Sequence, residues 1–145
     1  MPKQPLVLAI MDSTQTNITG DGTLFSLTGA IWNEIYDQND DFVDGTFTAP
    51  VTGRYLLCGT IMTSGNLSGH SVCYMQFLAS NRTSVMVYGH PYNSGGSLYH
   101  FKRSFSMIMD MDASDTVIMQ TETSGSTKVC DILANNAWFS ACLLG

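Results

Sequence analysis

Apolar and polar residues alternate along much of this chain with a period of two, which is the period of a β-strand. The segment 53–62 shows the pattern most clearly. One face carries Tyr55, Leu57, Gly59 and Ile61, and the other carries Leu56, Cys58, Thr60 and Met62. Both faces are largely apolar, so we expect this strand to be covered on both sides, by a facing sheet and by a neighbouring subunit.

Similar runs predict further strands, and no segment combines a helical period with helix caps. Many short strands separated by turn residues predict an all-β fold, an antiparallel β-sandwich. A chain of 145 residues is long enough for one domain with its own core, spanning 1–145. The strands are expected at 6–11, 29–36, 71–80, 85–88, 98–109, 116–123 and 137–144, with loops at 12–22 and 91–96.

A short strand, a tight turn and a long strand are predicted around Pro50. Proline cannot donate to a sheet ladder, so the first strand should end there. Gly53 is expected to supply the backbone freedom that the reversal needs. The pattern Phe47-x-x-Pro50-x-x-Gly53-x-Tyr55-x-Leu57 resembles the signature of the C1q head domain, a member of the tumour-necrosis-factor-like (TNF-like) jelly-roll superfamily.

Two later segments carry the same resemblance. Met111-Asp-Ala-Ser-Asp115-Thr-Val117 is similar to the family's Leu-x-x-Gly-Asp-x-Val segment, and 139–144 is similar to its closing Phe-Ser-Gly-Phe-Leu-Leu strand. The departures are Ser114 in place of Gly, and Ala-Cys at 141–142 in place of Gly-aromatic. The resemblance implies a C1q/TNF-like jelly roll that assembles as a trimer. Its fold-signature residues are Phe47, Pro50, Gly53, Tyr55, Leu57, Asp115, Val117, Phe139 and Leu143.

Subunits of this superfamily pack apolar sheet faces around a three-fold axis, so the resemblance also implies an interface. Aromatic residues and nine methionines exceed what one small core must hold, and methionine suits an adaptable buried seam. The alternative is that the same side chains form the core of the single subunit. The interface candidates are Leu56, Cys58, Tyr99, Phe101, Phe105, Met107 and Met109.

Composition and charge narrow the classes of partner. Only 12% of residues are charged and 44% are hydrophobic, which suggests that partners cover much of the surface. A compact monomer with a surface rich in Ser, Thr and Asn is the alternative. The net charge of −6 argues against binding to nucleic acid. The apolar run 6–11 is too short to span a membrane or to form a signal-peptide core, so neither a membrane partner nor an export signal is expected.

An acidic loop is the one candidate for binding a metal ion. Its carboxylates, from Asp37, Asp40, Asp41 and Asp44, could hold a hard cation such as calcium, although the loop lacks the Gly and the closing Glu of an EF-hand. Some members of the resembled family bind calcium. The alternative is a solvated acidic turn, and no cofactor is otherwise predicted.

Catalytic chemistry is not predicted from the remaining reactive residues. His70, His90 and His100 are scattered, without partners at metal-ligand or triad spacing, and are expected on the surface. The alternative is that one histidine from each chain meets on the three-fold axis of a trimer. The cysteines at 58, 73, 130 and 142 form no C-x-x-C motif and are expected to be free, either buried or at an interface, with disulfides as the alternative that an even count permits. No residue set for nucleophilic catalysis and no phosphate-binding loop is recognisable, so the chain is not expected to be an enzyme.

Two functions remain in view. The first is a structural trimer that docks on a larger assembly, as a viral (phage) capsid decoration or cement protein does, with a major capsid protein as partner and the virion as location. The chain starts with Met1-Pro2, shows no stalk or shaft, and carries Asn39 to Val51 in a form closer to phage and bacterial copies. The alternative is an extracellular recognition head that binds a receptor or a glycan through the loops 66–70 and 91–96, such as a phage tail-fibre tip or a secreted C1q-like domain.

Overall fold

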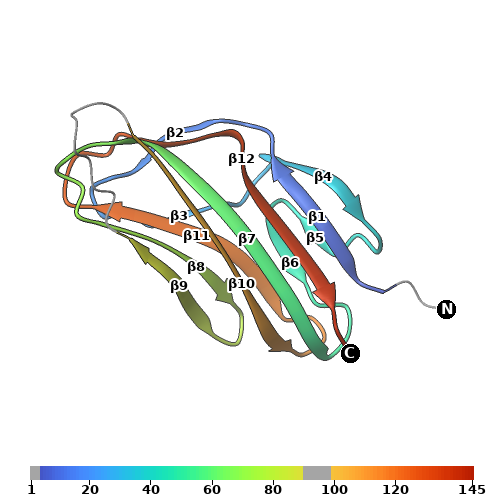
Figure 1. The fold of residues 1–145 in the computed structure, drawn as a ribbon. Coiled ribbons are helices and arrows are strands. Elements are labelled where there is room, and N and C mark those ends of the chain that lie inside the picture. The colour runs from blue at the N-terminus through green and yellow to red at the C-terminus, as the bar shows by residue number, and fades with distance from the viewer. Residues whose placement is uncertain (1–3, 90–98) are drawn as a thin grey trace.

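The computed structural model of the chain describes residues 4–89 and 99–145, apart from the side chains of 85–88 and Tyr99. Two antiparallel sheets, each with six strands in this part of the chain, pack face to face as a sandwich (Figure 1). The all-β sandwich that the period-two pattern predicted is confirmed. No helix of the described residues is long and apolar enough to cross a membrane.

The first sheet, here called the β7 sheet, contains both ends of the described chain. Its strands lie in the order β10 (Tyr99–Met111), β7 (Gly53–Asn66), β12 (Cys130–Leu143), β1 (Leu6–Met11) and β4 (Trp32–Asp37), and β2 (Gln15–Thr19) also pairs with β12. The terminal strands β1 and β12 are neighbours, so the two halves of the chain are joined in the middle of this sheet.

The second sheet, here called the β11 sheet, faces it. Its strands lie in the order β5 (Phe42–Val43), β6 (Thr46–Thr48), β11 (Thr116–Ser124), β8 (Val72–Ala79) and β9 (Thr83–Gly89), and β3 (Phe25–Ser26) also pairs with β11. Sequence-distant segments therefore meet in both sheets, since β6 and β8 lie on either side of β11.

The core lies between the sheets and is rich in aromatic rings. Phe139 stacks on Phe42 with ring centroids 5.3 Å apart, and Phe47 meets Tyr55 edge to face at 5.5 Å. Each strand contributes alternate residues, as predicted: Tyr55, Leu57 and Ile61 of β7 are fully buried. Leu56, Cys58 and Met62 of the same strand point to the other face and are only partly buried.

One loop prediction and the start points of two predicted strands were wrong. The segment 12–22 was expected to be a loop, but it contains β2, whose polar residues pair with β12. The strand expected from 29 begins at Trp32, after a bend. The strand expected from 137 begins at Cys130, because the sheet tolerates an irregularity between Ile132 and Ala137 where Asn135 adopts a positive φ of 64°.

The predicted reason for Gly53 was also wrong. Gly53 does not have a positive φ, so the turn does not need its backbone freedom. A β-carbon at this position would lie 2.6 Å from Cδ1 of Leu143, so glycine instead allows the end of β12 to pack against the turn. Two signature residues far apart in sequence thus meet.

Candidate functional site

The outer face of the β7 sheet, which points away from the core, carries a continuous group of apolar side chains. The strand registers place Leu6, Cys142, Leu56 and Ile108 side by side in one row across four strands. A second row contains Leu8, Ser140, Cys58 and Ser106, and a third contains Ile10, Trp138, Thr60 and Ser104. We call the apolar members of these rows the apolar face: Leu6, Leu8, Ile10, Leu56, Cys58, Ile108, Trp138 and Cys142.

These three rows contain no charged side chain. Ile108 is 60% exposed, and Tyr36, which pairs with Leu8 at the edge of the sheet, is 42% exposed. The other members of the apolar face are half-buried, because each is shielded by its neighbours within the sheet. Because large exposed apolar groups are uncommon on monomeric proteins, this face is the candidate interaction surface of the chain.

The outer face of the β11 sheet has a different chemistry. Gln76 donates to Gln120 at 2.6 Å, and Gln120 donates in turn to the hydroxyl of Ser26 at 2.9 Å. Tyr74 donates to the carboxylate of Glu122 at 2.6 Å. Gln76 and Gln120 are each only 6% exposed, and the exposed Val72 and Leu78 lie on the same face. This face therefore combines hydrogen-bonded polar pairs with single apolar side chains, whereas the three rows on the β7 sheet contain no charge.

The structure separates the interface candidates into three groups. Leu56 and Cys58 belong to the apolar face. Phe101, Phe105 and Met107 point toward the space between the sheets but stay partly exposed, because β10 is the last strand of its sheet. The side chain of Tyr99 lies outside the described residues.

The prediction that Met109 lies at the interface was wrong. The structure buries it completely in the core of the subunit, where it packs with the other residues between the sheets. It cannot contact a second copy in this conformation. The sequence does not indicate which face of β10 turns inward, because that depends on how β10 pairs with β7.

The acidic loop is organised by hydrogen bonds rather than as a cation cage. The carboxylate of Asp37 accepts from the backbone N–H groups of Asn39, Asp41 and Phe42, at 3.4, 3.0 and 2.7 Å. The carboxylate of Asp41 accepts from the amide of Asn39, and burial raises its pKa. Asp40 and Asp44 adopt positive φ values of 58° and 48°. Within residues 4–89 and 99–145 no group of three or more His, Cys, Asp or Glu could hold a metal ion.

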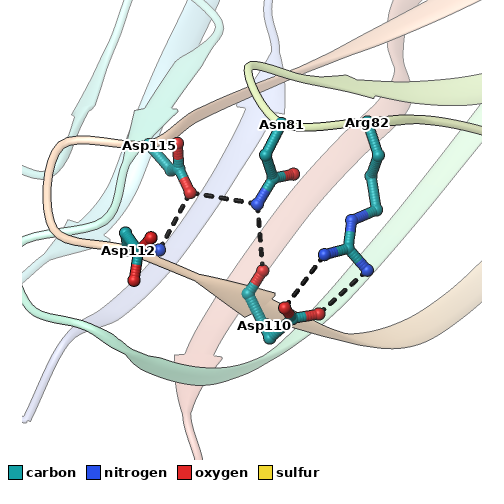
Figure 2. Close-up of polar contacts among 5 residues, drawn as sticks. All are labelled: Asn81, Arg82, Asp110, Asp112 and Asp115. Atoms are coloured by element: carbon teal, nitrogen blue, oxygen red, sulfur yellow. Dashed lines mark hydrogen bonds and ion pairs between the residues drawn. The ribbon is translucent and has the colours of Figure 1, made fainter.

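The signature residue Asp115 joins the two sheets at one end of the sandwich (Figure 2). Its carboxylate accepts from the hydroxyl of Ser80 at 2.6 Å, from the amide of Asn81 at 3.0 Å and from the backbone N–H of Asp112 at 2.8 Å. The bond from Ser80 is the main cause that lowers the pKa of Asp115. The family motif therefore supplies an acceptor that holds the turn after β10 against the turn after β8.

An ion pair extends this network. Asp110 accepts from the guanidinium of Arg82 through both carboxylate oxygens, each at 2.9 Å, and this lowers the pKa of Asp110. An open pocket of about 360 Å³ lies beside it, lined by Thr52, Gly53, Arg54, Asn81, Asp110, Met111, Asp112 and Gly145. Serine, cysteine and histidine are absent from this lining, and the hydroxyl of its Thr52 lies 3.4 Å from the carboxylate of Asp112.

A buried polar cluster lies at the opposite end and was not predicted. Arg103 is only 3% exposed, donates to the sulfur of Cys73 and to the hydroxyl of Thr63, and lies 5.0 Å from the ring centroid of Phe101. Burial lowers the pKa of Arg103 to about 10. No signal in the sequence distinguishes this arginine from a surface one, because its position on the inner face depends on long-range pairing.

The reactive residues expected from the sequence lie in different environments. All four cysteines are free, as predicted, with Cys73 and Cys130 buried and the other two on the apolar face. His70 was expected on the surface but is completely buried, since both of its ring nitrogens are bonded within the fold. His100 is exposed, and His90 and the loop 91–96 lie outside the described residues.

The chain is similar to known proteins in structure but not in sequence. No protein-family model and no curated protein matches the sequence. Among solved structures, the globular domain of zebrafish complement 1qA protein superposes with a TM-score of 0.62 at 18% identity, over 98% of each chain. Murine APRIL at pH 5.0 superposes with a TM-score of 0.65 at 8% identity, over 98% of this chain and all of that chain. The chain has the C1q/TNF-like jelly-roll fold.

The signature residues explain this jelly roll at the level of packing. Phe47, Tyr55, Leu57 and Val117 are fully buried, and Phe139 is nearly so.

Four residues of the apolar face were not among the predicted interface candidates: Leu6, Leu8, Ile10 and Trp138. The available signal was the unbroken apolar run 6–11, which is typical of a strand covered on both faces.

Proposed function

We propose that this chain is a non-enzymatic structural module that assembles as a homotrimer through the apolar face. The observation that supports this most directly is the apolar face itself, with eight apolar side chains in three adjacent rows that contain no charge. Hydrogen-bonded polar pairs occupy part of the other outer face instead. Burying the apolar face removes from water the side chains that a free subunit would expose.

A second copy is the occupant that the geometry favours. A closed ring with head-to-tail contacts needs two different surfaces that fit each other. The apolar face supplies one, and the open edge at β10, with Phe101, Phe105 and Met107 partly exposed, supplies the other. Three-fold closure is the assembly that we infer from the shared fold with C1q and APRIL.

For the role of the trimer, we propose docking on a larger assembly, as a viral capsid decoration protein in the virion. The form of the segment 39–51, which resembles phage and bacterial copies, supports this proposal, as does the low content of charged residues. A trimer fits three-fold positions on an icosahedral lattice, where several weak contacts to a major capsid protein add up.

The alternative is a recognition head that binds a receptor or a glycan outside the cell. The fold shared with the complement 1qA domain and APRIL is compatible with it. Of the two loops expected to contact a ligand, 66–70 contains His70, whose side chain is turned into the protein. We therefore rank this alternative second.

Light scattering on a matched pair of variants tests the assembly proposal. Leu8→Glu places a charge in the middle of the apolar face and should convert the trimer into a folded monomer, because a buried unpaired carboxylate is strongly unfavourable. Leu78→Glu is the control, since Leu78 is 36% exposed on the outer face of the β11 sheet, and it should leave the mass unchanged. If both variants keep the mass of the unmodified chain, the apolar face is not the interface.

A further inference from the structure

His70 lies in the connection between β7 and β8 and is completely buried. Its Nδ1 accepts a hydrogen bond from the backbone N–H of Leu67 at 2.8 Å. A ring nitrogen that accepts carries no proton, so the single proton of the neutral ring must be on Nε2. That nitrogen lies 3.0 Å from the carbonyl oxygen of Thr127 and donates to it. One imidazole thus joins the β7–β8 connection to the β11–β12 connection.

A third connection packs against the same ring. Gly20, which follows β2, donates its backbone N–H to the carbonyl of Thr123 and accepts at its own carbonyl from Ser126. With a φ of +132°, Gly20 approaches so closely that a β-carbon would lie 2.9 Å from Nε2 of His70 and 2.0 Å from the carbonyl oxygen of Thr127. The imidazole is therefore enclosed by three segments that are distant in sequence.

The groups around His70 do not compensate a positive charge. From β12, the sulfur of Cys130 lies 3.8 and 3.9 Å from the two ring nitrogens, and burial raises the pKa of this thiol to about 11, so it is neutral. The cations in this region are Arg103 on β10 and the exposed Lys128 beside Thr127. The carboxylates on these segments have other partners: Asp131, beside Cys130, accepts from the backbone of Asn17, and Asp21, beside Gly20, accepts from Thr23. Glu122, near the end of β11, accepts from Tyr74. No carboxylate of the described residues bonds to the ring.

Adding a proton to His70 would break this arrangement. A proton on Nδ1 would point at the N–H of Leu67, so two donors would face each other and the acceptor would be lost. The charged ring would also be buried without a counter-ion, which is costly. The ring can take up a proton only if the connections around it open and admit water.

We propose that His70 is an acid-sensitive latch that closes the end of the sandwich formed by Gly20, Leu67 and Thr127. When the ring is neutral, it holds the three connections together. When it takes up a proton, the 66–71 connection detaches from the 124–129 connection and exposes Cys130. The latch acts within one subunit and does not depend on the trimer.

Hydrogen exchange at the Leu67 amide tests this proposal directly. Its protection factor, corrected for the intrinsic effect of pH, should fall by up to about tenfold for each pH unit once the opening is coupled to uptake of one proton. The amide of Leu27, which bonds to the carbonyl of Met119 within the β11 sheet, reports global unfolding and should keep its protection over the same range.

Two variants separate titration from structure. In His70→Asn, the side-chain oxygen replaces Nδ1 as acceptor and cannot titrate, so Leu67 should stay protected as the pH falls. In His70→Gln, the amide can still reach Thr127 but the acceptor for Leu67 is lost, so Leu67 should be weakly protected at every pH. His100→Gln, at an exposed histidine, should behave as the unmodified chain does.

The reactivity of Cys130 is an independent measure of opening. In the unmodified chain, a disulfide reagent that works in acid, such as 4,4′-dithiodipyridine, should label Cys130 faster at low pH. In His70→Asn the labelling should not become faster. A pH-independent protection factor for Leu67, or an equal loss in His70→Asn, would overturn the latch. If His70→Asn does not fold, the unmodified chain alone still tests the latch. A loss of protection at Leu67 but not at Leu27 would support it, whereas equal losses of protection at both amides would mean global unfolding and would overturn it. None of these outcomes depends on the oligomeric state, so the latch and the trimer can fail separately.

Discussion

The hydroxyl of Tyr55 donates a 2.7 Å hydrogen bond to the carbonyl of Val51, four residues earlier. The ring of Tyr55 is completely buried against Phe47, so the bond closes the turn over Pro50 and fixes where β7 begins. Burial also raises the pKa of this phenol. The Pro-x-x-Gly-x-Tyr part of the signature thus encodes one turn together with its own closure.

Replacing this tyrosine should weaken the turn without disturbing the core. We expect Tyr55→Phe to lower the free energy of unfolding by about 1 kcal/mol, because the ring remains while one hydrogen bond is lost. Chemical denaturation at a fixed protein concentration measures it. Tyr36→Phe, at an exposed position on β4, is the control and should have no measurable effect.

Replacing Ser114 by glycine should stabilise the fold. This serine has a positive φ of 76° in the turn between β10 and β11, where the resembled family has glycine. A non-glycine residue in this region carries a steric cost, so we expect Ser114→Gly to raise the free energy of unfolding by about 0.5–1 kcal/mol. Ala113→Gly, next to it but without a positive φ, should lower stability instead. The same sign for both variants would contradict this account of the turn.

The network around Asp115 predicts a dependence on acid. Because the pKa of Asp115 is lowered in the folded state, its contribution to stability is present above its ordinary value of 3.8 and is lost as the pH falls through the folded value. Asp115→Asn removes that titration. We expect the melting temperature of the variant to fall less steeply below pH 3.8 than that of the unmodified chain.

The matched control for this experiment is Asp112→Asn in the same turn. Its carboxylate receives only a 3.4 Å contact from Thr52, whereas its backbone N–H makes the bond to Asp115. The acid slope of this variant should match that of the unmodified chain. A slope that changes as much in Asp112→Asn as in Asp115→Asn would show that the turn as a whole, not Asp115, is responsible.

Two methionines on β10 differ in exposure, so replacing each in turn should separate a contribution to the core from a contribution to the interface. Met109 is fully buried, so Met109→Ala should cost about 2–5 kcal/mol of stability, as large-to-small core changes do. Met107 is partly exposed at the open edge, so Met107→Ala should cost less in the subunit and should weaken the trimer more. Unfolding curves and the concentration dependence of the mass measure the two effects. Equal behaviour of the two variants would contradict the division.

Much of the fold could be predicted because its signals are local. The period-two alternation of 53–62 and the turn residues around Pro50 both act within a few residues. The strand β2 could not be found this way, since Gln15–Thr19 is polar and is a strand only because β12 lies beside it. The early start of β12 was missed for a similar reason, as the irregularity near Asn135 interrupts its pattern.

The candidate site was predicted only in part. Alternation correctly placed Leu56 and Cys58 on one face of the segment 53–62, but it does not say which face of a strand turns to the core. That choice depends on how β10 pairs with β7 and how the sheets face each other. Leu8 and Trp138 joined the apolar face only once the register between β1 and β12 placed them near Cys58. His70 and Arg103 became candidates only when their burial was known.

The measurement that tests the central claim most directly is the mass of the purified native protein by light scattering, with and without a chelator. We predict three times the 15.8 kDa of one chain in both conditions, because the apolar face needs no metal ion for its burial. A mass of 15.8 kDa would contradict the assembly proposal and leave the apolar face exposed on a free subunit. A trimer that dissociates in chelator would contradict our account of the acidic loop as a hydrogen-bonded turn.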